Sequence, residues 1–388
     1  MSTPWRLGLF YGLMFLANGA SLPYLPVWLR AQGLGGAAIG AILAAPYLAR
    51  VVTGPAAAVW ADGFHQRRTS LMLLAAAGAF AGAALLLTRG AGAHALAWFV
   101  ASSALMAMLP LMDVLGLRLS QREGFVYGRP RSGGSAAFIV ANLAMGALLT
   151  RGSPDLVVVW FAASMAVCAL CARLLPPEPI HEEGAPPLER RERWRGLKDL
   201  LTSPTFMLAI VTIGLIQGAH GFQYGFSALV WKGQGISEAV IGALWATGVA
   251  AEIVFLWFLP RDRVGPLGLM LIGGLASLIR WTLMAFGPPA AVLFPLQILH
   301  ALTFAATFVG GLRLVQRLCP PESVTAAQTL NASLSGGLFI GLASLASGAL
   351  FDAYGAGGYL AMTAMSLAGL VGLALLQRSL ARADAAVT

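Results

Sequence analysis

Long apolar segments recur along the whole chain, each separated from the next by a short polar turn. A helix needs about 20 apolar residues to cross the hydrocarbon core of a bilayer, which is about 30 Å thick. By this criterion the sequence predicts twelve membrane helices, at residues 7–29, 38–60, 69–88, 96–117, 132–150, 156–175, 204–226, 238–259, 266–286, 290–312, 325–350 and 357–377. The pattern therefore predicts an all-α membrane protein.

One long polar stretch divides these helices into two groups of six. The division predicts an N-terminal bundle, a cytoplasmic linker and a C-terminal bundle, at residues 1–175, 176–203 and 204–388. The linker begins with Pro176-Pro177-Glu178-Pro179, which ends the sixth helix because proline cannot continue a helix. Residues 188–201 mix Glu and Arg with apolar residues, a pattern typical of an amphipathic helix on a membrane surface.

The second bundle repeats the first with an offset of 202 positions, which brings Ile241-Gly242-Ala243 onto Ile39-Gly40-Ala41. In the same register Glu252 falls on Arg50, and each lies in the middle of an apolar helix. The two bundles are therefore predicted to be pseudo-symmetric. Parallel repeats of this kind build many secondary transporters, in which the substrate site lies between the halves near the midplane.

The composition excludes a soluble globular protein, because 58% of the residues are hydrophobic and only 11% are charged, against about 25% in soluble domains. The net charge of +9 follows from the topology, since nearly all Lys and Arg fall in segments that are cytoplasmic when the N-terminus lies inside. We therefore expect a multi-pass protein of a bacterial-type inner membrane, with both termini cytoplasmic. Its predicted partners are the lipid bilayer, protons and a small-molecule substrate, with no nucleic acid, and it is expected to be a monomer.

Motifs of known enzyme classes were not found in the sequence. It contains no GxxxxGK[ST] loop, no nucleophile elbow, no HExxH and no cluster of His and Asp residues. Cys168 and Cys171 form a CxxC within an apolar helix, where they are interpreted as small packing residues. The sequence therefore predicts neither an enzyme nor a bound metal or cofactor.

A few charged residues lie where the helices cross the middle of the bilayer, at a cost of about 2.5–3.5 kcal/mol each. Arg50 and Arg280 are candidate anchors for a substrate carboxylate, because the guanidinium offers paired donors. The alternative for Arg50 is an ion pair with Asp113 or Glu252 that only fixes helix packing. Asp113 is predicted to form a structural or gating pair, with either Arg50 or Arg131.

Glu252 is the predicted proton-coupling residue, with His300 as a second candidate. Burial favours the protonated carboxyl and a nearby Arg favours the charged one, so a moving Arg could switch its protonation. A permanent ion pair between Glu252 and Arg280 is the alternative.

Polar residues also share helix faces in the second bundle. Gln217-x-x-His220 and Gln297-x-x-His300 each place two polar side chains on one face, and Tyr224 extends the first face by a turn. Such faces are expected to line a cavity, because facing lipid would leave their donors unsatisfied. The predicted substrate contacts are Arg50, Asn18, Gln217, His220, Tyr224, Arg280, Trp281, Trp245 and Gln297.

The loop Ala61-Asp62-Gly63-Phe64-His65-Gln66-Arg67-Arg68 resembles the cytoplasmic gating motif of the major facilitator superfamily, as does the twelve-helix plan. The resemblance implies a latch role for Asp62, Arg67 and Arg68. Gly63 stands where the superfamily usually has a basic residue. The equivalent loop of the second bundle keeps an acidic residue at Asp262.

Further strings are similar to one branch, the phenylpropionate permease-like family, which is related to the lactose permease group. They are Tyr127-Gly128-Arg129-Pro130-Arg131, Gln217-Gly218-Ala219-His220, Arg280-Trp281 and Gln297-Ile298-Leu299-His300 with Thr303-Phe304. This resemblance implies proton-coupled symport of a small organic anion, such as 3-phenylpropionate or a related aromatic acid, by alternating access. Sugar or nucleoside uptake, drug efflux and a non-transporting receptor are the alternatives.

Overall fold

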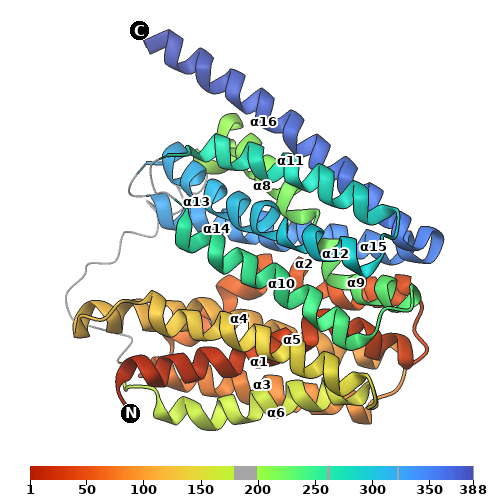
Figure 1. Ribbon diagram of the computed structural model, residues 1–388. Coiled ribbons are helices and arrows are strands. Elements are labelled where there is room, and N and C mark those ends of the chain that lie inside the picture. Colours follow the sequence, from red (N-terminus) through yellow and green to blue (C-terminus); the bar gives the residue numbers. More distant parts are fainter. Residues whose placement is uncertain (179–198, 260–262, 321–322, 388) are drawn as a thin grey trace. The chain divides into compact units, whose positions relative to one another are not determined.

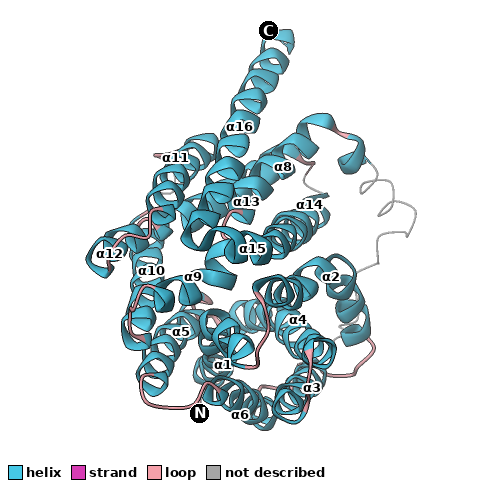
Figure 2. Cartoon of the chain, turned by 90° about the vertical axis from the view of Figure 1, so that its right-hand side faces the viewer, coloured by secondary structure: helices cyan, strands magenta, loops and turns pink. Residues whose placement is uncertain are grey.

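The computed structural model describes residues 1–178, 199–259, 263–320 and 323–387. Helices dominate these residues and no β-strand is present among them (Figure 2). The predicted amphipathic helix at 188–201 lies almost entirely outside the described residues, and so does Asp262. The predicted all-α fold class is confirmed.

The first six long helices follow one another with short turns (Figure 1). They are α1 (Thr3–Ala31), α2 (Gly36–Asp62), α3 (Arg67–Leu87), α4 (Ala91–Glu123), α5 (Gly128–Leu149) and α6 (Asp155–Cys171), the last continued by the 3₁₀ turn η1 (Ala172–Leu174). Helix α1 packs against α5 and α6, and α3 packs against α4 and α6. Small residues allow close approach: a Cβ on Gly19 of α1 would lie 2.8 Å from the Phe138 carbonyl oxygen on α5.

The helices after the linker are more often interrupted. They are α8 (Pro204–Gly218), α9 (Gly221–Gly233), α10 (Glu238–Phe258), α11 (Pro266–Ala285), α12 (Ala290–Ile298), the π-helix η2 (Ala301–Ala306), α13 (Thr307–Leu318), α14 (Val324–Ser333), the π-helix η4 (Leu334–Phe339), α15 (Ile340–Tyr354), the 3₁₀ turn η5 (Gly355–Gly358) and α16 (Tyr359–Val387). Helix α8 packs against α16 and η4, and α11 packs against α13, α16 and η2.

The contacts within the chain divide it into two compact units. The first comprises Met1–Gly184 with Tyr224–Ala246, and the second comprises Ala185–Gln223 with Thr247–Thr388. The second unit has an apolar core in which Phe206 and Ile213 of α8 meet Leu314 of α13 and Leu373 of α16. The buried polar cluster described below also belongs to the second unit. The division of the sequence into two six-helix bundles at residues 175 and 204 stays a prediction.

Ten segments of the described chain are long and apolar enough to cross a membrane. Helix α1 is not among them. The last segment, Ala326–Arg382, has 57 residues, and the structure divides it at η5, where Gly355 has a φ of +55°. Since about 20 residues suffice for one crossing, this segment is long enough for two. The predicted twelve helices are reached only with α1 added and this segment counted twice.

Two predicted helices are interrupted where polar residues gather. The predicted helix 204–226 breaks after Gly218 and resumes at Gly221, which leaves His220 in the turn between them. Gly218 packs directly on Phe339 and Gly221 on Ala343, so this break is held by tertiary contact. The predicted helix 290–312 contains the π-helix η2, an element found frequently at functional sites. Discontinuous membrane helices likewise surround the sites of many transporters.

Candidate functional site

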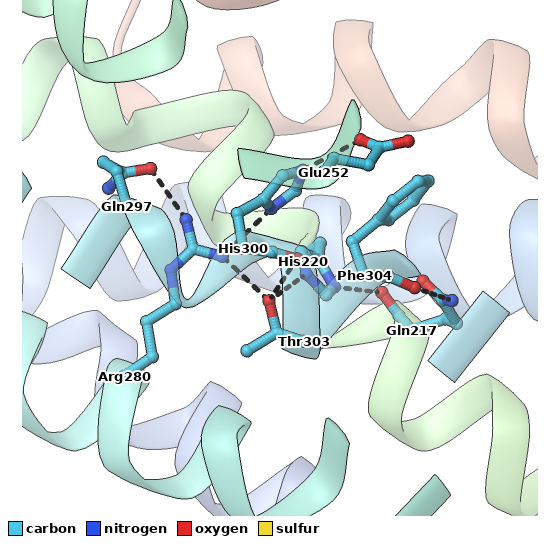
Figure 3. Close-up of polar contacts among 8 residues, drawn as sticks. All are labelled: Gln217, His220, Glu252, Arg280, Gln297, His300, Thr303 and Phe304. Carbon is cyan, nitrogen blue, oxygen red and sulfur yellow. Dashed lines mark hydrogen bonds and ion pairs between the residues drawn. The ribbon is translucent and has the colours of Figure 1, made fainter. Parts of the chain in front are cut away.

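A cluster of buried polar side chains lies at these two interruptions (Figure 3). We name it the Arg280 cluster; its members are Gln217, His220, Glu252, Arg280, Gln297, His300, Thr303 and Phe304. They come from α8, the turn after it, α10, α11, α12, the junction between α12 and η2, and η2 itself. The two Gln-x-x-His faces predicted from the sequence therefore meet in one place.

Arg280 is fully buried, at 0% exposed, and three side chains accept hydrogen bonds from its guanidinium. Nη2 donates to Gln297 Oε1 at 2.7 Å, while Nη1 donates to Thr303 Oγ1 at 2.9 Å and to His300 Nδ1 at 3.1 Å. The guanidinium carbon also lies 4.6 Å from the centre of the Trp281 ring, a cation–π distance. Protein groups thus occupy the surroundings of Arg280 in this structure.

His220 joins the cluster from the helix break. Its Nδ1 lies 3.0 Å from the Gln217 carbonyl oxygen and its Nε2 lies 3.1 Å from Thr303 Oγ1. The Gln217 side chain turns the other way and donates from Nε2 to the Phe304 carbonyl oxygen at 3.2 Å. Thr303 is therefore the group shared by Arg280 and His220, although the sequence alone did not single it out as a site residue.

Glu252 lies at the edge of the cluster. Its Oε2 is 3.8 Å from His300 Nε2, which is longer than a hydrogen bond, and its side chain is 23% exposed. The opposite nitrogen of His300 faces Arg280, so the imidazole stands between the guanidinium and the carboxyl group. The two predicted proton-coupling residues are thus neighbours.

Arg50, in the first unit, has different surroundings. It lies twelve residues before the end of α2 and is half-buried. Over the part of the chain that the structure describes, its side chain has no hydrogen bond or ion pair. The predicted alternative, a pair with Asp113, is not formed; Asp113 contacts Arg131 instead, at 3.4 Å. Asn18 is half-buried on α1, also in the first unit.

The predicted aromatic contacts fall into two groups. Trp281 is fully buried, the Arg280 guanidinium lies 4.6 Å from its ring centre, and the Tyr359 ring is stacked on it at 5.8 Å. Tyr224 and Trp245 belong to the first unit, with ring centres 6.0 Å apart. Trp245 is 6% exposed, and its indole N–H has no acceptor among the described residues.

Asp113 is the centre of a second polar group, on α4. Its Oδ1 accepts hydrogen bonds from Tyr11 at 2.6 Å and Tyr127 at 2.7 Å, in addition to the contact with Arg131 Nε. Burial raises the pKa of Tyr127 to about 12, so that this phenol stays a neutral donor. The predicted pairing of Asp113 with Arg131 is therefore present, and its gating role stays a prediction.

The predicted latch residues lie at the end of α2 and the start of α3. Asp62 is exposed, the Arg67 N–H donates to the Glu178 carbonyl oxygen at 3.2 Å, and Arg68 reaches the Leu175 carbonyl oxygen at 3.5 Å. The Glu178 carboxylate, almost fully buried, accepts from Arg122 Nη1 at 2.5 Å. This ion pair was missed from the sequence, where Glu178 was interpreted only as part of a helix stop.

Comparison with known proteins agrees with this architecture. A family model described as the MFS_1 like family matches residues 4–360. The chain is 28% identical to the probable 3-phenylpropionic acid transporter of Escherichia coli (strain K12), over 94% of this chain and 96% of that protein. It is 29% identical to the maltose permease of Geobacillus stearothermophilus, over 95% of this chain and 93% of that protein.

Among solved structures, that of the nucleoside transporter NupG matches with a TM-score of 0.84 at 18% identity. It covers 97% of this chain and 99% of that one. At this identity the likeness shows the fold. The family model spans nearly the whole chain, and these relatives are transporters rather than enzymes. The chain belongs to the MFS_1 like family and is a multi-pass membrane transporter of the major facilitator superfamily.

Proposed function

We propose that this transporter is a proton-coupled symporter of a small organic anion, such as 3-phenylpropionate or a related aromatic acid. The observation that carries the proposal is the contrast between the two membrane arginines. Arg280 donates to three protein acceptors, whereas the Arg50 side chain makes no hydrogen bond or ion pair with any described residue. A guanidinium held at the middle of a membrane needs a compensating anion, and a substrate carboxylate is a matching one.

The aromatic part of the substrate is assigned to Tyr224 and Trp245, which share the first unit with Arg50. A Cβ built on Gly225 would lie 3.3 Å from Leu43 Cδ1, so α9 approaches α2 there. Arg50 follows Leu43 by seven residues, two turns along the same face, or roughly 10 Å. A carboxylate at Arg50 and a ring beside Tyr224 suit an acid whose ring and carboxylate are joined by a short chain.

Proton coupling is assigned to Glu252, a carboxyl group within a membrane helix that lies beside His300. Uptake into the cell through an inner membrane, with both termini cytoplasmic and a monomeric protein, completes the proposal. The name of the Escherichia coli relative supports an aryl-propanoate substrate. The name of the maltose permease supports a second candidate, sugar uptake.

Uptake of labelled 3-phenylpropionate into proteoliposomes with an inward proton gradient tests the proposal. We expect accumulation above empty vesicles that collapses with a protonophore. An excess of unlabelled 3-phenylpropionate should abolish the signal, and an equal excess of maltose should leave it unchanged. Accumulation of labelled maltose, with none of the aryl acid, would replace the anion assignment by sugar uptake. Accumulation that survives the protonophore would remove the proton coupling.

A further inference from the structure

We infer that His300 is a positioning residue and that Glu252 alone takes up the transported proton in the Arg280 cluster. Arg280 fixes the His300 imidazole with its proton on Nε2, the nitrogen that faces Glu252. The inference rests on the proposed proton coupling and deepens it, because it gives different roles to the two residues that the sequence analysis named as first and second candidates for proton coupling. It follows from which atoms of the cluster are able to donate and which are able to accept.

The first step concerns His300 Nδ1. Arg280 Nη1 lies 3.1 Å from it, and the nitrogens of an arginine side chain are donors only. His300 Nδ1 must therefore accept this hydrogen bond with its lone pair and carries no proton. A neutral imidazole has one N–H, so the proton of His300 sits on Nε2. A second proton on this ring would require the Arg280 contact to break.

The second step concerns His220. Its Nδ1 lies 3.0 Å from the Gln217 carbonyl oxygen, which only accepts, so this nitrogen carries the proton. Its Nε2 then accepts from the Thr303 hydroxyl at 3.1 Å, while Thr303 Oγ1 accepts from Arg280 at 2.9 Å. Donation thus runs from Arg280 through Thr303 and His220 to Gln217. Both ring nitrogens of His220 have a hydrogen-bond partner while His220 is neutral.

The charges of the cluster also favour Glu252 over the histidines as the proton acceptor. Arg280 is already a fully buried cation, and the two imidazole rings lie 5.6 Å apart. The charged or titratable groups facing His300 are Arg280, His220 and Glu252, while Phe304 covers one ring face at 5.2 Å. A second cation on either histidine would be repelled by Arg280 in a low-dielectric interior. The protonatable group that adds no second cation is the Glu252 carboxylate.

The arrangement gives His300 a function in coupling. Its Nε2–H points at Glu252, 3.8 Å away, and an N–H donor favours a carboxylate over a neutral carboxyl group. Proton uptake on a Glu252 oxygen forms one O–H bond, removes the negative charge and weakens the attraction between α10 and His300. Loss of the proton restores that attraction. Each passage through the cycle moves one proton at this cluster.

The tautomers of the histidines test the inference directly and need no substrate. The protein has five histidines, so ¹⁵N-histidine NMR of the full chain in lipid nanodiscs gives few signals, and His300→Gln and His220→Gln assign two of them. We expect His300 with its proton on Nε2 and His220 with its proton on Nδ1, both unchanged between about pH 5 and pH 8. A proton on His300 Nδ1, or a doubly protonated His300 in this range, would overturn the inference.

Transport by matched variants gives the second test. Glu252→Gln should abolish gradient-driven accumulation and spare exchange of substrate across the membrane. His300→Gln keeps an amide donor but does not titrate, so we expect its gradient-driven accumulation to stay within about tenfold of the unmodified protein. If His300→Gln loses accumulation and keeps exchange, as expected for Glu252→Gln, then His300 is itself a proton carrier. If the unmodified protein accumulates no 3-phenylpropionate, the proposed function fails, and the NMR result still decides the tautomers.

Discussion

Arg50 and Arg280 are both arginines in the middle of membrane helices, and their surroundings differ in almost every respect. Arg280 is fully buried and donates to Gln297, Thr303 and His300. Arg50 is half-buried, and no hydrogen bond or ion pair to it exists within the described ranges. The Arg280 guanidinium is bound by side chains of its own unit. The Arg50 guanidinium has N–H donors that no acceptor among the described residues receives.

This difference separates a structural role of a membrane arginine from a role in ligand binding. The cost of placing the charge in the bilayer is similar for both, so the cost alone marks each as functional. What separates them is where the donors go: a guanidinium whose donors end on protein acceptors organises the fold, and one without such acceptors is available to a ligand. Substitutions at the two positions should therefore affect different quantities.

The largest effect is expected for Arg280→Gln on stability. The change leaves His300 Nδ1 and Thr303 Oγ1 without their buried donor, and buried groups that lose a partner cost about 1–3 kcal/mol each. We expect the free energy of unfolding to fall by about 3–5 kcal/mol, in the range seen when one partner of a buried charged network is removed. Denaturant unfolding of the purified protein in detergent measures it.

Arg50→Gln is the matched control, because it removes the same charge from the middle of a helix. Its free energy of unfolding should not fall, since no described protein group loses a hydrogen bond or ion pair and the substitution removes a charge that is costly in the membrane. Equal destabilisation by the two substitutions would contradict the contrast between the arginines.

Substrate binding, unlike stability, should depend on Arg50. Loss of a charge-assisted bidentate contact costs about 3 kcal/mol, so Arg50→Gln is expected to weaken 3-phenylpropionate binding by about 100-fold. Arg50→Lys keeps the charge and loses the fork, and should weaken binding by about tenfold. Calorimetric titration of the folded variants measures both. Unchanged affinity in Arg50→Gln would move the anion site away from α2.

Much of the fold was predictable from the sequence because the bilayer imposes a length on every crossing. Apolar runs of about 20 residues located most of the helices, and Pro and Gly located many of the turns. The break at His220 was not predictable, since it depends on Gly218 and Gly221 packing against Phe339 and Ala343, more than a hundred residues away. The π-helix at Ala301–Ala306 was not predicted from the sequence either.

The candidate site was predicted in part. Spacing alone placed Gln217 with His220 and Gln297 with His300 on shared faces, and the structure brings both pairs to Arg280. The sequence could not separate Arg50 from Arg280, because the difference lies in which acceptors surround each. Thr303 was overlooked as a site residue because a single hydroxyl in an apolar helix is indistinguishable from one bonded to its own backbone.

The smallest expected effect sharpens the description of Arg280. Thr303→Val keeps the shape of the side chain and removes the hydroxyl that accepts from Arg280 and donates to His220. We expect the free energy of unfolding to fall by about 1–3 kcal/mol, the cost of leaving buried polar partners unsatisfied.

Thr307, one turn further on, is equally buried, but its hydroxyl has no hydrogen-bond partner among the described residues. Thr307→Val should therefore be neutral within about 0.5 kcal/mol, because no partner loses a contact. If both valine variants unfold alike, the Thr303 hydroxyl is not a member of the Arg280 network, and the series of donors from Arg280 to Gln217 is interrupted at its centre.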